Sequence, residues 1–377
     1  MKQHQILRAA GLALLICGLA KAGTRAPFDA PGAGTGAYQG TFALAINPAG
    51  KIVGYFTDAS NLAHGFVRER DGSFVTFDAP GAVNGTFPAA INPGGWITGY
   101  YFDANLLAHG FVRTFNGSFV VFDAPGAVQG TFPSGISILG EITGNFLESS
   151  LVYHSFVRTV TGAIKVFSDP NAGTGEFEGT SAAEVDPQGA VVGCYTDSHS
   201  YGFNFLRTPA GTLSMLNPPG GGGGYFGCNG IFSVVAFSVS INELGVVAGT
   251  YFQPIEGAGF GGNYRGFARA SDGNYTTFDT VPSPSSPCCT WTIPLSINRE
   301  GQIVGYDNDF HDVNHGFVRA PSGAITLLDA PGAGTAPFQG TFATSINAAG
   351  MIAGYYTDSS NVAHGFLSTS FPNQSAH

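Results

Sequence analysis

The hexapeptide AHGFVR at residues 63–68 recurs along the chain, as AHGFVR at 108–113, YHSFVR at 153–158, NHGFVR at 314–319 and AHGFLS at 363–368. Its phenylalanine marks seven copies, most of them roughly 45 to 50 residues apart, a period typical of repeat folds. The seven positions are Phe66, Phe111, Phe156, Phe205, Phe267, Phe317 and Phe366. Because a catalytic site needs unlike groups at one point, a motif spread at such intervals indicates architecture.

Around the hexapeptide, each copy of the repeat is consistent with four short strands. The first strand ends in IN, as in TFALAIN (41–47), and the turn NPAG (47–50) follows with the residues of a type I turn. The second strand, KIVGYFTD (51–58), contains a glycine in every copy, where we expect close contact between sheets. The hexapeptide is the third strand, and DG (71–72) turns it into the fourth, SFVTFDAPGA (73–82).

This pattern predicts an all-β fold, a seven-bladed β-propeller with four antiparallel strands per blade. The segment PFDAPGA (27–33) is a fourth strand without the three before it, and HGFLSTS (364–370) is a third strand without a fourth. We therefore expect the N-terminal strand to pair with the last blade and close the ring, which hides the sheet edges. The predicted propeller spans 23–370 and precedes a tail at 371–377. Its blades are 40–80, 85–125, 130–170, 178–218, 232–280, 291–330 and 340–370 plus 26–31.

The recurring pattern IN..G.I.GYY.D.....HGF resembles the HAF-type repeat of exported bacterial proteins, with glycine usually in place of the alanine. The resemblance covers nearly all of the chain after the N-terminal segment. It implies an exported repeat protein. That family has no established activity, so the resemblance implies no catalytic residues.

The N-terminus has the three parts of a signal peptide, predicted to be 1–22. Lys2 and Arg8 are basic, AAGLALLICGLA (9–20) is apolar, and 20–22 is a small-x-small cleavage site. The apolar run is too short to span a bilayer, and no later stretch is suited to it, so we predict no membrane span. The expected location is secreted, extracellular or periplasmic, and the expected state is a monomer.

Composition excludes several classes of protein. Charged residues are 11% and hydrophobic residues 44% of the chain, which argues against disorder. The net charge of −10 disfavours binding to nucleic acid or to an anionic membrane surface. After residue 22 the cysteines are Cys194, Cys228, Cys288 and Cys289, without a CxxC pair that would suggest zinc. Since adjacent cysteines rarely bridge each other, Cys288 or Cys289 is expected to reach Cys228 or Cys194, but the sequence leaves the disulfide connectivity open.

Two polar positions recur with the repeat. One slot holds His64, His109, His154, His315 and His364, and Phe203 and Arg265 in the other two copies. An acidic residue precedes each histidine, and these residues are Asp58, Asp103, Glu148, Asp307 and Asp358. The second slot holds Arg68, Arg113, Arg158, Arg207, Arg269 and Arg319. The histidines could act as general bases or metal ligands, and the arginines could form a basic ring for an anion. Repetition instead favours structural hydrogen bonds within each blade, which for arginine would go to turn carbonyls.

Four segments interrupt the repeat and are better candidates for function, because loops on a rigid scaffold usually carry binding. They are 220–232, 254–265, 280–291 and 307–314, which we expect on one face over blades 4 to 6. The candidate ligand-binding residues there are Tyr225, Phe226, Phe260, Tyr264, Arg265, Trp291, Asp309 and His311. Aromatic rings of this kind stack on sugars or hold peptides. Merely tolerated surface loops remain the alternative.

The stretch DNDFHDVN (307–314) also offers oxygen ligands in Asp307, Asp309 and Asp312. A Ca²⁺ ion would suit them, but the glycine and distal glutamate of an EF-hand loop are missing, so we favour an acidic solvated loop and predict no cofactor. The function that the sequence favours is binding or scaffolding of a carbohydrate or protein. A propeller enzyme acting on polysaccharide, as a lyase or hydrolase, is the alternative, and a purely structural repeat is the third. No catalytic residues are assigned.

Overall fold

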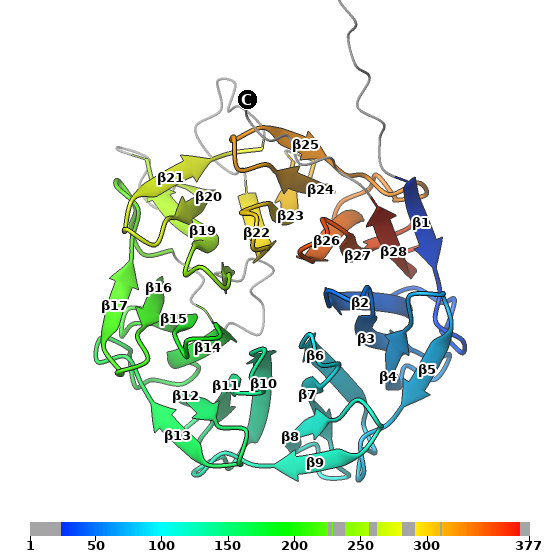
Figure 1. Cartoon of the computed structure of the whole chain (residues 1–377), viewed down its shortest axis with the longest axis horizontal. Coiled ribbons are helices and arrows are strands. Elements are labelled where there is room, and N and C mark those ends of the chain that lie inside the picture. Colours follow the sequence, from blue (N-terminus) through cyan, green and yellow to red (C-terminus); the bar gives the residue numbers. More distant parts are fainter. Residues whose placement is uncertain are drawn as a thin grey trace, which may run out of the picture.

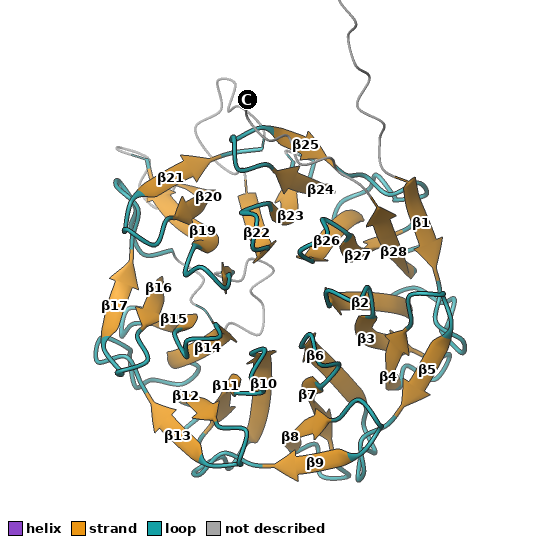
Figure 2. Ribbon diagram, viewed as in Figure 1, coloured by secondary structure: helices purple, strands orange, loops and turns teal. Residues whose placement is uncertain are grey.

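The computed structural model describes residues 24–224, 228, 238–255, 262–280, 291–309 and 311–369. These residues form β-strands and no helix, in one sheet of 16 strands and another of 12 (Figure 2). The prediction of an all-β fold is therefore confirmed. The predicted signal peptide and tail lie outside the described residues. Among the described residues, no helix is long and apolar enough to cross a membrane.

Consecutive strands form antiparallel groups of four around a common centre, with the first strand of each group innermost (Figure 1). The first groups are β2 (Gly40–Ile46), β3 (Ile52–Thr57), β4 (Ala63–Arg68) and β5 (Phe74–Phe77); β6 (Thr86–Ile91), β7 (Ile97–Phe102), β8 (Ala108–Arg113) and β9 (Phe119–Phe122); and β10 (Gly130–Ile136), β11 (Ile142–Leu147), β12 (Tyr153–Arg158) and β13 (Ile164–Phe167).

Three more complete groups and the three C-terminal strands follow the same order along the chain. They are β14 (Gly179–Val185), β15 (Val191–Thr196), β16 (Gly202–Arg207) and β17 (Leu213–Leu216); β18 (Val239–Ile241), β19 (Val247–Pro254), β20 (Gly262–Arg269) and β21 (Tyr275–Phe278); β22 (Trp291–Ile297), β23 (Ile303–Asn308), β24 (Asn314–Arg319) and β25 (Ile325–Leu327); and β26 (Gly340–Ile346), β27 (Ile352–Thr357) and β28 (Ala363–Thr369).

The last three strands obtain a fourth from the other end of the sequence. Strand β1 (Thr24–Phe28) pairs antiparallel with β28, with Phe28 opposite Gly365 (Figure 1). The Phe28 ring also packs edge-on against Phe66 of the next group, with ring centroids 6.4 Å apart. The predicted pairing between the N-terminal strand and the last third strand is thus present.

Neighbouring groups meet where their strands begin. Gly40 at the start of β2 pairs with Ala363 at the start of β28, and Gly130 of β10 pairs with Ala108 of β8 in the same way. The connection into each group and the turn between the second and third strands of its neighbour therefore share one end of the molecule. We call this end the loop face; it carries, for example, the turn at 58–62. The turns after the first strands, such as 47–50, lie at the opposite end.

The phenylalanine of the hexapeptide is the centre of each group, and all seven side chains have 0% exposure. The recurring glycine of the second strand lies across from this ring. A Cβ atom on Gly54 would overlap the carbonyl oxygen of Phe42 on the first strand, where a bulge shifts the register between Ala43 and Ala45. The predicted contact between sheets is therefore wrong. The glycine admits the neighbouring strand of its own group, because the bulge brings that carbonyl inward.

Candidate functional site

Each histidine of the repeat lies between two acidic or hydroxyl side chains on the loop face. The Nδ1 atom of His64 is 2.9 Å from Asp78, which ends the fourth strand, and its Nε2 atom is 3.7 Å from Asp58. His109 is placed in the same way between Asp123 and Asp103. The second partner, Asp58, was predicted from the repeat, and the closer one, Asp78, was not. A histidine held between two side chains of neighbouring strands acts as a structural link between those strands.

The arginine slot links neighbouring groups. The guanidinium of Arg113 lies over the Phe77 ring of the preceding group, 4.7 Å from its centroid, and Arg68 lies over Phe28 of β1 at 4.8 Å. Arg158 also donates to the carbonyl of Thr159 at 3.3 Å, so the predicted bond to a turn carbonyl is present there. The stacking on an aromatic ring was not predicted. Since the guanidinium groups are engaged, they form no open basic ring.

A belt of aromatic rings runs through the first and second strands of neighbouring groups. Successive centroids are 4.7 to 5.3 Å apart. The rings in order are Tyr306, Phe342, Tyr355, Phe42, Tyr55, Phe87, Tyr100 and Phe132. Strand register places Ser181 and Cys194 at these positions in β14 and β15, and Thr250 in β19. We call strands β26–β28, β1 and β2–β9 the regular arc, and β14–β25 the variable arc.

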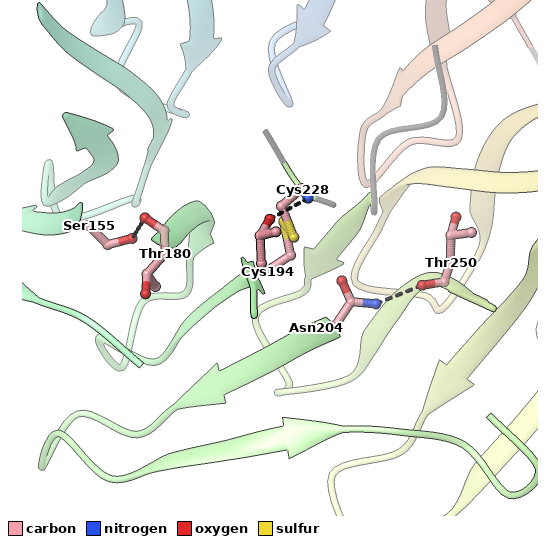
Figure 3. The surroundings of a disulfide bond; sticks show 7 residues. Ser155, Thr180, Cys194, Asn204, Cys228 and Thr250 are labelled. Atoms are coloured by element: carbon pink, nitrogen blue, oxygen red, sulfur yellow. Dashed lines mark hydrogen bonds between the residues drawn. A yellow bond between two sulfur atoms is a disulfide. The ribbon is translucent and has the colours of Figure 1, made fainter. Parts of the chain in front are cut away.

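A disulfide occupies the break in the belt. Cys194 of β15 is bonded to Cys228, 34 residues further along the chain (Figure 3). The Cys228 N–H donates to the hydroxyl of Thr196 at 2.9 Å. The expected bridge to Cys288 or Cys289 is therefore wrong, because Cys194 and Cys228 already pair with each other. Cys288 and Cys289 lie outside the described residues.

Two of the glycines in the hexapeptide slot are replaced beside this break. Ser155 donates to the carbonyl of Thr180 at 3.0 Å, and Asn204 donates to the carbonyl of Thr250 at 2.7 Å (Figure 3). Both bonds reach the next group. Elsewhere the same slot admits rings, as at Gly110 beside Phe122. Polar links thus replace aromatic packing at the joints on either side of β14–β17.

The histidine slot departs from the repeat at Phe203 and Arg265. Phe203 stacks on Tyr195, with centroids 5.4 Å apart. Arg265 forms a bidentate ion pair with Asp279, the residue that corresponds to Asp78, and donates to Gln253 at 2.6 Å. Its hydrogen bond with Asp279 is the main reason that the pKa of Arg265 is raised. Arg265 therefore takes over the structural link that histidine makes in the regular arc.

Of the predicted aromatic residues, Tyr264 and Trp291 lie together. Their strands pair, and their rings make an edge contact with centroids 6.2 Å apart. Tyr264 is buried at 3% exposure, so its ring belongs to the core and offers no open face to a ligand. Trp291 is partly exposed. Tyr225, Phe226 and Phe260 lie outside the described residues.

The segment 307–314 is not an insertion, which corrects the sequence analysis. Asn308 pairs with Asn314 as Thr57 pairs with Ala63, so the turn has its ordinary length. Asp309 accepts hydrogen bonds from the N–H groups of His311 and Val313, at 2.8 and 2.9 Å. Although burial alone raises the pKa of Asp309, these bonds outweigh it and lower that pKa. Asp309 therefore has the same turn-stabilising role as Asp58.

The other polar residues of this turn do not converge on a common point. His311 is 84% exposed, with its Nδ1 atom 3.5 Å from Asp309, and Asp312 is exposed in a left-handed conformation with φ 60°. Within the described ranges, no group of three His, Cys, Asp or Glu side chains is arranged to hold a metal ion.

Asp307 is the real departure in this segment. It occupies the place where Phe56, Tyr101 and Tyr356 stack on their histidines, and Asp309 is the residue that lies near His315, at 3.6 Å. Asp307 is 3% exposed, and although the Thr280 hydroxyl lies near it, neither carboxylate oxygen has a partner at full hydrogen-bond geometry among the described residues. Burial raises the pKa of Asp307, while the nearby Thr280 hydroxyl and His315 partly oppose this. Sequence comparison of the copies would have found this position.

The centre of the molecule contains cavities that the sequence analysis did not anticipate. One of about 440 Å³ is lined by the first strands of the groups, including Ala45, Ala90 and Glu184. An adjoining cavity of about 570 Å³ shares Leu44 and Leu295 with it and is lined by Tyr100 and other rings. Glu184 corresponds to Ala45 and is an acid where the other groups have alanine, glycine or serine.

No protein-family model matches the sequence, and no curated protein matches it significantly. Solved structures do resemble the fold. A streptogramin B lyase structure is 13% identical and covers 92% of this chain and 98% of its own, with a TM-score of 0.54. A catalytically inactive virginiamycin B lyase from Staphylococcus aureus with quinupristin is 12% identical, with coverage of 92% and 99% and a TM-score of 0.53. These β-propeller structures show that the fold is propeller-like, and at this identity they show the fold alone.

Proposed function

We propose that the chain is an exported seven-bladed β-propeller, closed by β1, that binds a ligand through the loop face of the variable arc. Closure is supported by the pairing of β1 with β28 and by Arg68, which stacks on Phe28 of β1 as Arg113 stacks on Phe77. If β1 is the fourth strand of a closed ring, Phe28→Ala and Phe77→Ala should lower the free energy of unfolding by similar amounts, about 3 kcal/mol each. A cost near zero for Phe28→Ala would contradict closure.

The concentration of departures in neighbouring groups carries the binding proposal. Three adjacent groups have a replaced repeat residue, namely Phe203, Arg265 and Asp307. The Cys194–Cys228 disulfide lies in the same arc. The regular arc keeps its histidines and its aromatic belt. A structural repeat has no need for such local divergence, whereas a binding face on a rigid scaffold does. The partly exposed Trp291 and the exposed His311 favour a carbohydrate as the ligand, since an aromatic ring and polar groups together recognise sugars.

A glycan array and a peptide array probed with the mature protein test this function. We expect glycan hits that Trp291→Ala weakens at least tenfold. Trp96→Ala is the matched control, because Trp96 is the other tryptophan and follows the turn at the opposite end. Hits confined to peptides would assign a protein partner instead. Failure of both arrays, or equal binding by Trp291→Ala, would contradict the proposal.

An enzyme acting on polysaccharide is the second candidate, favoured by Asp307 alone. A carboxyl with a raised pKa beside a histidine has the character of a general acid, and because Asp307 is 3% exposed, a substrate must first uncover it. Polysaccharides should be screened for new reducing ends and for the absorbance of the double bond that a lyase creates. Turnover that is lost in Asp307→Asn and kept in Asp123→Asn, the control from the regular arc, would favour the enzyme. Without turnover, the binding proposal stands on the arrays.

A further inference from the structure

One position on the innermost strands connects each group to the next through a side-chain oxygen. The Ser240 hydroxyl accepts a hydrogen bond from the N–H of Ile297 at 3.3 Å. The Ser296 hydroxyl accepts from Ile346 at 3.4 Å, and Ser345 from Ile46 at 3.2 Å. A serine hydroxyl is therefore sufficient for this link between groups.

Glu184 makes the same link with a charged group. Its Oε2 atom accepts from the N–H of Ile241 at 3.0 Å and from the Ser240 hydroxyl at 2.6 Å. Serine would provide the link to Ile241 without the cost of removing a carboxylate from water. The hydrogen bond between groups needs only one oxygen, so neither the charge nor the second oxygen of Glu184 is required for it. Burial raises the pKa of this carboxyl, and the two hydrogen bonds partly oppose the effect.

The surplus charge faces the central cavity. Among the described residues that line the cavity of about 440 Å³, Glu184 is the only ionisable one, and the others are aliphatic or carry hydroxyl groups. The adjoining cavity of about 570 Å³ continues along Leu44 and Leu295 to the rings of Tyr100 and Phe132. These volumes fall in the range of small-ligand sites, roughly 300 to 1,000 Å³.

The other end of the central space is also acidic. A cavity of about 160 Å³ there is lined by Glu184, Asp186 and Glu243, with Arg299 as its basic residue. Arg299 already lies 3.7 Å from Glu243. Asp186 occupies the position of Asn47, whose side-chain amide donates to the next group. Strand β14 and the turn that follows it thus contain both acidic replacements, Glu184 and Asp186, and the central space attracts cations.

We propose that the central cavity binds an organic cation, a primary ammonium with an apolar body. The ammonium donates to Glu184 and to neighbouring hydroxyl groups, and the apolar body lies along Leu44 and Leu295 toward Tyr100. The pairing compensates the desolvated carboxylate, which a neutral ligand does not. A metal ion fits less well, because one carboxylate in an aliphatic wall supplies too few ligands. This site is separate from the loop-face site proposed above.

Calorimetric titration with hexylammonium at pH 8, with hexanol as the neutral probe of the same length, tests the site. We expect hexylammonium to bind at least tenfold more tightly than hexanol. Glu184→Ser introduces the serine that three other groups have at this position, and Glu184→Gln keeps the shape of the side chain. Both variants should fold, and both should weaken the affinity for hexylammonium at least tenfold. Glu69→Gln is the control, since Glu69 pairs with Lys51 away from the cavity.

A variant that leaves Glu184 intact tests whether the ligand occupies the cavity itself. Ala90→Leu narrows the cavity and should weaken hexylammonium and hexanol alike, while thermal unfolding confirms that the variant is folded. The proposal is overturned if hexylammonium does not bind the wild-type protein. It is also overturned if Glu184→Ser binds hexylammonium as tightly as the wild type.

Discussion

In the regular arc, Phe42 and Tyr55 stack with centroids 4.8 Å apart, and the belt continues into both neighbouring groups. In β14 and β15 of the variable arc, the positions of these rings hold Ser181 and Cys194, and a disulfide and hydrogen bonds to backbone carbonyls connect neighbouring groups there. Both arcs nevertheless keep the fully buried phenylalanine and the turn asparagine or aspartate. The phenylalanine core of each group is constant and arginine stacking between groups persists, as for Arg207 over Phe167, whereas the aromatic belt between groups is interrupted. The fold therefore tolerates divergence at the joints, where ligand sites can arise.

The most damaging change should be Gly54→Ala in the regular arc, compared with Gly249→Ala in the variable arc. A Cβ atom on Gly54 overlaps the Phe42 carbonyl, whereas on Gly249 it would lie 2.8 Å from the carbonyl oxygen of Ser238. The first strand there, β18, is short and can shift. We expect Gly54→Ala to cost about 3 kcal/mol or more and Gly249→Ala about 1 kcal/mol, as overpacking does. Denaturant unfolding measures both, and equal costs would mean that the two arcs are equally rigid.

Removing the disulfide should have the next largest effect, and only on the variable arc. Replacing both Cys194 and Cys228 by serine frees a closed loop, for which we expect a loss of about 2–4 kcal/mol. Denaturant unfolding with and without reductant measures it. Reductant should destabilise the wild type by the same amount and leave the double variant unchanged. If peptide mapping finds Cys194 bonded to Cys288 or Cys289, the pairing described above is wrong.

A smaller difference should separate two arginines. Arg113 lies 4.7 Å from the Phe77 centroid of its neighbour, whereas Arg269 lies 6.0 Å from Tyr275 of its own group. Arg113→Met removes a contact between groups and should cost about 1 kcal/mol, and Arg269→Met should cost less. Thermal unfolding of the two variants side by side measures the difference. A greater loss for Arg269→Met would show that stacking across the joint contributes little.

Sequence reasoning found what every copy repeats. Phe66 and its equivalents, the turn at Asn47 and the hairpin turns depend on local residues, so the repeat displays them. Asp78 was also within reach, because the hairpin places it near His64. The stacking of Arg113 on Phe77 was not, since contacts between groups depend on how far they lie apart. Glu184 and Asp307 stand out only when the copies are aligned, and their environments, a cavity and a buried pocket, exist only in three dimensions.

The smallest predicted effect is a pH dependence at His315. Burial by itself lowers the pKa of His315, but the hydrogen bond and charge of Asp329 and the charges of Asp307 and Asp309 outweigh it, so the pKa is raised. A raised pKa means that the protonated ring stabilises the fold fully below the unfolded value of about 6.5, and that this contribution is lost as the pH rises through the folded value. Since the side chain is 29% exposed, we expect less than about 1 kcal/mol.

Two substitutions sharpen this comparison between the arcs. Asp329→Asn should lower the His315 pKa by removing its closest charge, 3.0 Å away. Asp307→Phe introduces the ring that stacks on histidine in the regular arc. Because it removes another nearby charge, it should also lower the pKa of His315. NMR titration of the His315 ring measures each pKa, and the difference in unfolding free energy between pH 5.5 and pH 8 should become smaller in Asp329→Asn. An unchanged pKa in Asp307→Phe would show that Asp307 is protonated throughout the titration, because a neutral carboxyl has no charge to remove.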